Sequence, residues 1–249
     1  MTQQTKQSEL EAMLNSFRLP SFNKNYQQYA RKAEKEKLDH VAYLYQLAMS
    51  ESEDRYNRKT ERLIRQAKLP RGKVLEKFDL SRFSGISASQ ISQLAEGVGL
   101  DVAENLLIFG NPGTGKTHLA AALGREWCLR GRKVFFTSAS APVQDLLAAK
   151  RDLMLNRLLR RLDRFEVVII DDISYIPQDK DETDVLFVLL AERYERRSLV
   201  VTSNLPFSQW DKVFKDTMTT TAAIDRLVHY STVLELNGES YRAETAKRQ

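Results

Sequence analysis

Apolar and polar positions follow two different periods along this chain. Up to about residue 68 the apolar residues recur every three or four positions, which is the spacing of amphipathic helices. From Glu104 onward, short continuous apolar runs alternate with helical stretches, as in parallel strands that crossover helices cover on both faces. We therefore predict a small helical domain followed by a parallel α/β sheet.

The helical part and the sheet part can each be divided further. Three or four helices are predicted at the front, with Ser8 and Glu11 spaced as a capping box, Pro20 ending the first pattern and Asp39 placed to cap a later helix. The sheet is predicted to hold five strands. These are residues 105–109, 133–137, 167–171, 199–203 and 232–236.

Proline, glycine and charge separate the two parts. Pro70, Gly72 and the polar stretch SRFSGISAS indicate the join. We predict a basic helical N-terminal domain at residues 1–75 and a sheet domain at 76–249, of which 76–103 form a linker region. Residues 1–75 hold 15 Lys/Arg against 9 Asp/Glu, and the remainder holds 23 against 24. This basic excess favours a polyanion partner, and a solvated helical surface is the alternative.

Composition argues against membrane and disulfide-rich classes. Charged residues make up 29% of the chain, and no apolar run approaches the roughly 18 residues of a membrane span. The N-terminal stretch has no signal-type apolar region, so a cytoplasmic location is expected. The one cysteine, Cys128, can form no intrachain disulfide and is predicted to lie in the core.

The strongest chemical signal is the run NLLIFGNPGTGKT, which fits the pattern Gly-x-x-x-x-Gly-Lys-Ser/Thr. Backbone N–H groups of such a loop converge on a triphosphate at the positive end of a helix, and glycines allow the tight wrap. Lys116 is expected against the β- and γ-phosphates, and the Thr117 hydroxyl on Mg²⁺. A glycine-rich turn that binds nothing is the alternative. The predicted ATP-binding residues are Gly110, Asn111, Pro112, Gly113, Thr114, Gly115, Lys116, Thr117 and His118.

Polar side chains at the ends of two predicted strands complete this prediction. Asp171 ends the run VVIIDD, where it can reach Mg²⁺ as the acidic partner of Thr117. Asp172 points differently and can orient the attacking water or accept its proton, unless it only caps the turn. Asn204 follows another strand and can hold this water near the γ-phosphate, unless it is only a turn former.

The motifs taken together resemble the IstB family of insertion-sequence transposition helper ATPases. The runs that carry the resemblance are GNPGTGKTHLAAALG, VVIIDD, RYERRSLVVTSNLPFSQWDKVF and DRLVHYSTVLELNGESYR. This family belongs to the AAA+ group of P-loop proteins and is related to the DnaC and DnaI helicase loaders and to DnaA. The resemblance covers essentially the whole chain, including the basic helical front and the FDL linker at residues 78–80.

The resemblance implies roles that the residues alone leave open. Asn204 becomes a sensor, Arg226 an arginine finger offered to a neighbouring subunit, and Arg242 a second sensor; without the family pattern both arginines read as surface residues. One departure concerns the Walker B acids. Such proteins commonly have Asp-Glu-Leu-Gly, whereas this chain has Asp171-Asp172-Ile173-Ser174. The shorter carboxylate predicts slow or partner-dependent hydrolysis.

Basic residues follow the second predicted strand. Residues 142–164 are predicted as one helix that combines basic side chains with an apolar stripe of Leu146, Leu147, Leu153, Leu158 and Leu162. In assemblies resembling this family, the corresponding region faces a central channel where basic side chains track phosphates. We expect contacts to double-stranded DNA that depend little on sequence, and residues 157–164 could instead face a neighbouring subunit. The predicted DNA contacts are Lys150, Arg151, Arg157 and Arg160.

The leading hypothesis is an ATP-dependent homo-oligomer that remodels target DNA and recruits and stimulates the transposase of its element. A helicase loader, a small-molecule P-loop kinase and a nucleotide-gated DNA scaffold with negligible turnover are the alternatives. Asn204, the two late arginines and the basic front argue against the kinase, because phosphoryl transfer to a metabolite requires none of them.

Overall fold

The chain forms two compact units, Met1–Arg62 and Leu63–Gln249. The computed structural model describes residues 3–83, 85–175, 180–212, 217–238 and 240–241. The division falls within the long helix α3 (His40–Ala67) and not at residue 75, where the sequence placed it. The physical reason is that Leu63 and Ala67, in the last turns of α3, are buried in the core of the second unit.

The first unit contains α1 (Gln3–Ser16), α2 (Pro20–Glu36) and most of α3. Pro20 is the first residue of α2, and the Asp39 carboxylate accepts a 2.7 Å hydrogen bond from the backbone N–H of Ala42, so both predicted signals are confirmed. The predicted capping box is wrong. Because α1 begins at Gln3, Ser8 lies inside the helix and its hydroxyl donates to a carbonyl one turn earlier.

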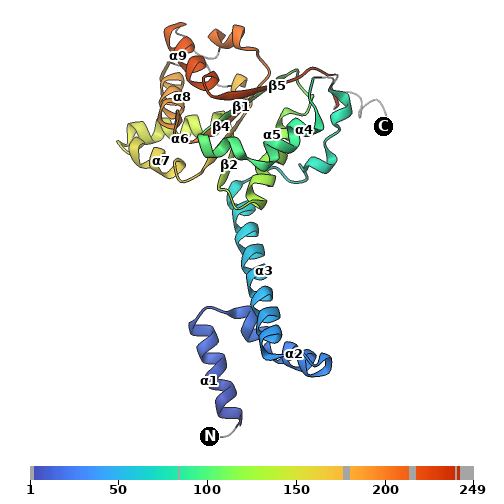
Figure 1. Ribbon diagram of the computed structural model, residues 1–249. Helices are drawn as coiled ribbons and strands as arrows, with labels where there is room; N and C mark the ends of the chain where they lie inside the picture. The colour runs from blue at the N-terminus through green and yellow to red at the C-terminus, as the bar shows by residue number, and fades with distance from the viewer. Residues whose placement is uncertain (1–2, 84, 176–179, 213–216, 239, 242–249) are drawn as a thin grey trace, which may run out of the picture. The chain divides into compact units, whose positions relative to one another are not determined.

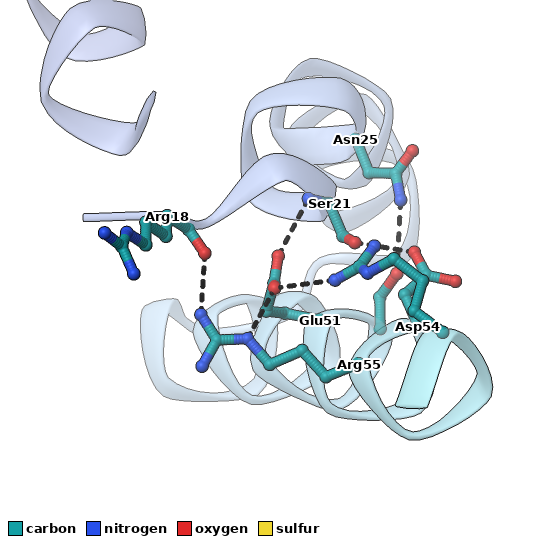
Figure 2. Close-up of polar contacts among 8 residues, drawn as sticks. Arg18, Ser21, Asn25, Glu51, Asp54 and Arg55 are labelled. Atoms are coloured by element: carbon teal, nitrogen blue, oxygen red, sulfur yellow. Dashed lines mark hydrogen bonds and ion pairs between the residues drawn. The ribbon is translucent and has the colours of Figure 1, made fainter. Parts of the chain in front are cut away.

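A buried carboxylate joins α2 to α3 in this unit (Figure 2). Glu51 of α3 is 4% exposed, accepts the backbone N–H of Ser21 at 2.8 Å, and forms an ion pair with Arg55 at 2.7 Å. Burial acts against the charged carboxylate, but these hydrogen bonds hold the pKa of Glu51 below its ordinary value. The carboxylate thereby caps the N-terminus of α2, whose first N–H groups have no partner within the helix.

The second unit is built on a parallel five-stranded sheet in the order β2-β3-β4-β1-β5. All five predicted strands are confirmed, with ends that differ by at most one residue. They are β1 (Asn105–Gly110), β2 (Val134–Ser138), β3 (Val167–Asp171), β4 (Ser198–Ser203) and β5 (Ser231–Leu236). This order brings the carboxyl ends of β1, β3 and β4 together, because β4 lies between β1 and β3.

Helices cover both faces of the sheet (Figure 1). Alternate side chains of each strand enter opposite cores: Leu107 of β1 packs with one set of helices, and its neighbours Leu106 and Ile108 pack with the other. Cys128 lies in the second of these cores, as predicted, and burial raises the pKa of its thiol to about 11. One face carries α4 (Ala88–Glu96) and α5 (Lys116–Leu129). The other carries α6 (Ser140–Arg151), α7 (Leu155–Leu162), α8 (Lys180–Arg193) and α9 (Thr217–Val228).

The single helix predicted over residues 142–164 is wrong, because α6 and α7 are separate. Leu153 lies between them with a positive φ of 58°, which ends the first helix, and its side chain is 92% exposed. Leu153 therefore does not belong to the apolar stripe, whereas Leu146 and Leu162 are buried in the core.

A buried arginine connects the N-terminal ends of β3 and β4. Arg193, at the end of α8, is 2% exposed, and burial lowers the pKa of its guanidinium to about 10. It donates to the carbonyls of Glu166, which precedes β3, and Ser198, which begins β4, at 3.2 and 3.0 Å. These hydrogen bonds hold the starts of β3 and β4 together. The carboxyl ends of the same two strands carry the candidate site. Within the described part of the chain, no helix is both long enough and apolar enough to cross a membrane.

Candidate nucleotide-binding site

The glycine loop joins the end of β1 to the start of α5. Gly113 and Gly115 have φ angles of 84° and 102°, in the left-handed region that favours glycine. A Cβ atom on Gly113 would collide with Ser240, and one on Gly115 would lie 3.1 Å from the ring of Phe78. Backbone conformation therefore favours glycine at both positions, with little space for a side chain at Gly113, and the loop leaves its N–H groups at the N-terminus of α5.

The remaining loop residues divide into a rim and a buried turn. Asn111 and Pro112 are exposed, whereas Thr114 is buried and donates its hydroxyl to the carbonyl of Asn111 at 2.9 Å. Gly110 continues the pairing of β1 with β5. The predicted nucleotide contacts at residues 110–117 thus form one continuous loop, in which Thr114 closes the turn.

Lys116 is the first residue of α5 and is only 6% exposed. Its ammonium donates to the carbonyls of Gly110 and Asn111, both at 2.9 Å, and to Oδ1 of Asn204 at 2.6 Å. These acceptors keep the charge at the mouth of the loop. Phosphate oxygens carry more negative charge than carbonyl or amide oxygens and would compete for the same ammonium protons.

Asp171, the last residue of β3, lies between two threonines. Its Oδ2 accepts the hydroxyl of Thr117 at 3.0 Å, and its Oδ1 accepts the hydroxyl of Thr202 at 2.7 Å. A hydroxyl and a carboxylate are the hard oxygen donors that suit Mg²⁺, which usually takes few protein ligands and completes its shell with phosphate and water. Among the described residues, no group of three or more His, Cys, Asp or Glu side chains is placed to hold a metal ion.

Asp172 follows Asp171 and takes a left-handed conformation, with a φ of 59°. Both of its carboxylate oxygens accept the Asn204 amide at 2.9 Å, and its own backbone N–H donates to the Thr202 hydroxyl at 2.8 Å. Burial raises the pKa of Asp172 above its ordinary value, although the hydrogen bond from Asn204 favours the charged form. Asn204 therefore joins Lys116 to Asp172 through the two ends of one amide.

His118 has a different setting from the rest of the predicted nucleotide contacts. Its Nε2 lies 2.9 Å from the carbonyl of Val74, and its ring meets Phe78 edge-on with centroids 5.5 Å apart. A carbonyl only accepts, so Nε2 carries the proton. In this structure His118 ties the linker to α5, and a nucleotide contact by His118 stays a prediction.

Of the two late arginines, the structure describes Arg226, which lies apart from this group. The guanidinium of Arg226, on α9, lies 4.7 Å from the ring centroid of Phe187 on α8. Among the described residues it makes no hydrogen bond to the glycine loop or to the Walker B acids. Arg242 falls outside the described residues, immediately after Tyr241, whose backbone N–H donates to the carbonyl of Gly113 at 3.1 Å.

The predicted DNA contacts lie on exposed surface. Lys150 and Arg151 end α6, and the Lys150 ammonium pairs with Asp181 at 3.2 Å. On α7, Arg157 and Arg160 are exposed and share an open hollow of about 890 Å³. Arg161 and Arg164 line the same hollow, so the four arginines follow one face of the helix and its C-terminal end.

The sequence interpretation missed several residues of the site. Thr202 holds both acids, and the Ser174 hydroxyl accepts the backbone N–H of Asn204 at 2.9 Å. Phe78 and Ser240 flank the loop. One feature of the sequence could have indicated Thr202, which is a polar residue directly after the apolar run at residues 199–201.

Comparison with known proteins agrees with this geometry. The sequence profile of the family described as "IstB-like ATP binding protein" matches residues 12–249. The chain belongs to the IstB-like ATP-binding protein family. An insertion sequence ATP-binding protein of Sinorhizobium fredii is 42% identical, over 96% of this chain and 81% of its own length. The ATP-binding protein of insertion sequence IS21 from Pseudomonas aeruginosa is 35% identical, over 96% and 91%.

Solved structures place this IstB-like chain in the AAA+ fold. DnaA from Aquifex aeolicus with bound AMPPCP aligns with a TM-score of 0.57 at 20% identity, over 73% of this chain and 55% of that protein. DnaI aligns with a TM-score of 0.53 at 20% identity, over 70% and 94%. The predicted fold class, an AAA+ parallel sheet preceded by helices, is confirmed, and so is the predicted family with its ATP ligand.

Proposed function

We propose that this protein is an oligomeric, DNA-binding ATPase that remodels target DNA and recruits and stimulates the transposase of the same insertion sequence. The observation that carries the proposal is the chain of contacts from Lys116 through Asn204 to Asp172, beside the pair Thr117 and Asp171. This arrangement places a cation, an amide and a raised-pKa carboxylate at the carboxyl end of adjacent strands, where α/β sheets bind ligands.

Binding of ATP would first change the partners of Lys116. Its ammonium would leave the loop carbonyls and Asn204 for the β- and γ-phosphate oxygens. Oδ1 of Asn204 would then be released, while its amide nitrogen still holds Asp172. This exchange gives Asn204 a means of reporting phosphate occupancy to the acid that orients water.

Hydrolysis would then use Asp172 as the base. Asp172 would orient a water molecule and take its proton as the water oxygen bonds to the γ-phosphorus. The bond from that phosphorus to the bridging oxygen breaks, and its electron pair leaves with ADP. Thr117 and Asp171 would hold Mg²⁺, which would supply positive charge to the phosphates. Arg226 of a neighbouring copy would offset the remaining negative charge.

The proposed DNA contacts are the exposed basic residues of α6 and α7. The replication initiator DnaA, which has the same fold, was solved bound to AMPPCP and single-stranded DNA. We propose that this chain binds double-stranded DNA through the phosphates, because the described residues show basic side chains and no base-reading motif.

The function is tested by adding duplex DNA to the full chain. We expect duplex DNA to raise the ATP turnover rate, and ATP to drive self-association measured by sedimentation. A magnesium-ATP complex that leaves the protein monomeric, with a rate that duplex does not change, would contradict the proposal. Adding a transposase of the same insertion sequence then tests stimulation of DNA strand transfer.

Alanine at both Lys150 and Arg151 should weaken duplex binding and leave ATP affinity unchanged. Each lost phosphate contact should lower the slope of log affinity against log salt by about one, and the affinity by a similar factor on different sequences. Fluorescence anisotropy at several salt concentrations measures this slope. Alanine at Arg130 and Lys133, where α5 joins β2, removes the same charge elsewhere. An unchanged slope in the first double variant would exclude Lys150 and Arg151 from the DNA interface.

A further inference from the structure

We propose that Thr202 is the positioning residue that orients both Walker B acids. Its one hydroxyl would fix the position of the acid that binds Mg²⁺ and of the acid that orients the water. The inference rests on the proposed function, in which Asp171 serves Mg²⁺ and Asp172 serves the water. It concerns a buried side chain on β4 to which the sequence motifs assign no role.

Thr202 acts where the backbone ladder between two strands stops. The pairing of β3 with β4 runs to Ile170 and Val201, and the next residues are Asp171 and Thr202. Beyond that point the Thr202 hydroxyl takes over, because it accepts the N–H of Asp172 at 2.8 Å and donates to Oδ1 of Asp171 at 2.7 Å. The side chain is 0% exposed, so water does not compete for either bond.

The first consequence concerns Asp171. With Oδ1 held by Thr202, the carboxylate cannot rotate freely, and Oδ2 stays directed at the Thr117 hydroxyl 3.0 Å away. Hydrogen bonds of this kind orient a metal-binding carboxylate, and their loss typically lowers metal affinity or activity about 10- to 100-fold. Thr202 thus acts on the metal through Asp171 without touching it.

The second consequence concerns Asp172. A left-handed φ of 59° is unfavourable for a residue with a side chain and persists where surrounding contacts fix it. The hydrogen bond from the Asp172 backbone N–H to the Thr202 hydroxyl fixes the backbone of Asp172, and the amide of Asn204 fixes its carboxylate. Without the hydroxyl, the buried N–H would lose its partner and Asp172 could leave this conformation.

Packing alone would not require threonine at this position. Thr202 follows Val200 on the same face of β4, and valine has nearly the same shape as threonine and the same preference for strands. Between Ser198 and Ser203, which begin and end β4, the other residues are Leu199, Val200 and Val201. The difference between threonine and valine is the hydroxyl, and both of its bonds go to the acids.

The test compares Thr202→Val with Thr202→Ser by measuring ATP affinity calorimetrically in excess Mg²⁺ and in EDTA. In the parent we expect Mg²⁺ to strengthen ATP binding. Valine should reduce this gain about tenfold or more, with the affinity in EDTA unchanged, and serine should retain it because it keeps the hydroxyl. In steady-state assays valine should lower kcat more than it changes KM, because Asp172 is also released.

Controls separate the outcomes. Ser198→Ala removes a buried hydroxyl at the other end of β4 and should leave the Mg²⁺ gain unchanged; thermal unfolding reports whether each variant folds. If valine does not fold, Thr202→Ala against Thr202→Ser gives the same comparison, since these differ by the hydroxyl alone. A parent without any Mg²⁺ gain would contradict the proposed metal chemistry. If Mg²⁺ strengthens ATP binding as much in the variant without the hydroxyl as in the parent, the proposed role of Thr202 is wrong.

Discussion

Replacing Arg226 by alanine is expected to lower ATP turnover by about a thousandfold or more while each subunit still binds ATP. An arginine supplied by a neighbour acts on charge that develops in the transition state, so its loss affects the rate and not the binding of a single subunit. In the structure its guanidinium lies against Phe187, and it makes no hydrogen bond to the described residues around Lys116. Steady-state ATPase assays on duplex DNA and ATP titration calorimetry measure the two effects.

Mixing experiments decide whether Arg226 acts between subunits. Asp172→Asn and Arg226→Ala should each be inactive, but a mixture should regain turnover wherever an intact Asp172 of one copy meets an intact Arg226 of another. Arg197→Ala, which removes an exposed arginine before β4, is the matched control and should behave like the parent. If Arg226→Ala assembles and turns over ATP at the parent's level, Arg226 is not an arginine finger. A mixture that stays inactive would place any catalytic role of Arg226 within its own subunit.

Replacing Asp172 by asparagine should lower turnover by about 10²- to 10⁴-fold with little change in ATP affinity, because a general base is lost and the phosphate cradle is kept. Asparagine also presents an amide to Asn204, whose nitrogen donates to both oxygens of Asp172 in the parent. Glutamate at this position should retain turnover, since its carboxylate reaches further toward the water. Single-turnover hydrolysis measures the chemical step directly.

The pH profile gives the same residue a second test. Burial raises the pKa of Asp172, and the base works only when it is deprotonated, so turnover should fall as the pH drops through that raised pKa. This acid limb should therefore begin at a higher pH than an ordinary aspartate would give. Asp101→Asn, which neutralises an exposed acid paired with Arg132, should keep both the rate and the limb. Full turnover in Asp172→Asn would remove Asp172 from the mechanism.

Local pattern was enough to predict the parts of the site that lie on one strand or one turn. The spacing of Gly110, Gly115 and Lys116 predicts a phosphate-binding loop. The apolar run before Asp171 predicts a buried strand that ends in a carboxylate. The helix break at Leu153 escaped prediction because the apolar and basic spacing continues through it. Only the left-handed backbone at this residue interrupts the helix.

The amino-acid sequence by itself determined the five strands, their parallel arrangement, the ATP loop and the family, because these follow from short-range periodicity and from motifs of adjacent residues. Tertiary structure alone decided that the end of α3 belongs to the second unit, that Lys116 reaches Asn204, and that the Thr202 hydroxyl holds both acids. These contacts join residues far apart in the chain. They exist only once β4 lies between β1 and β3, and a strand order of this kind is set by packing of the whole sheet.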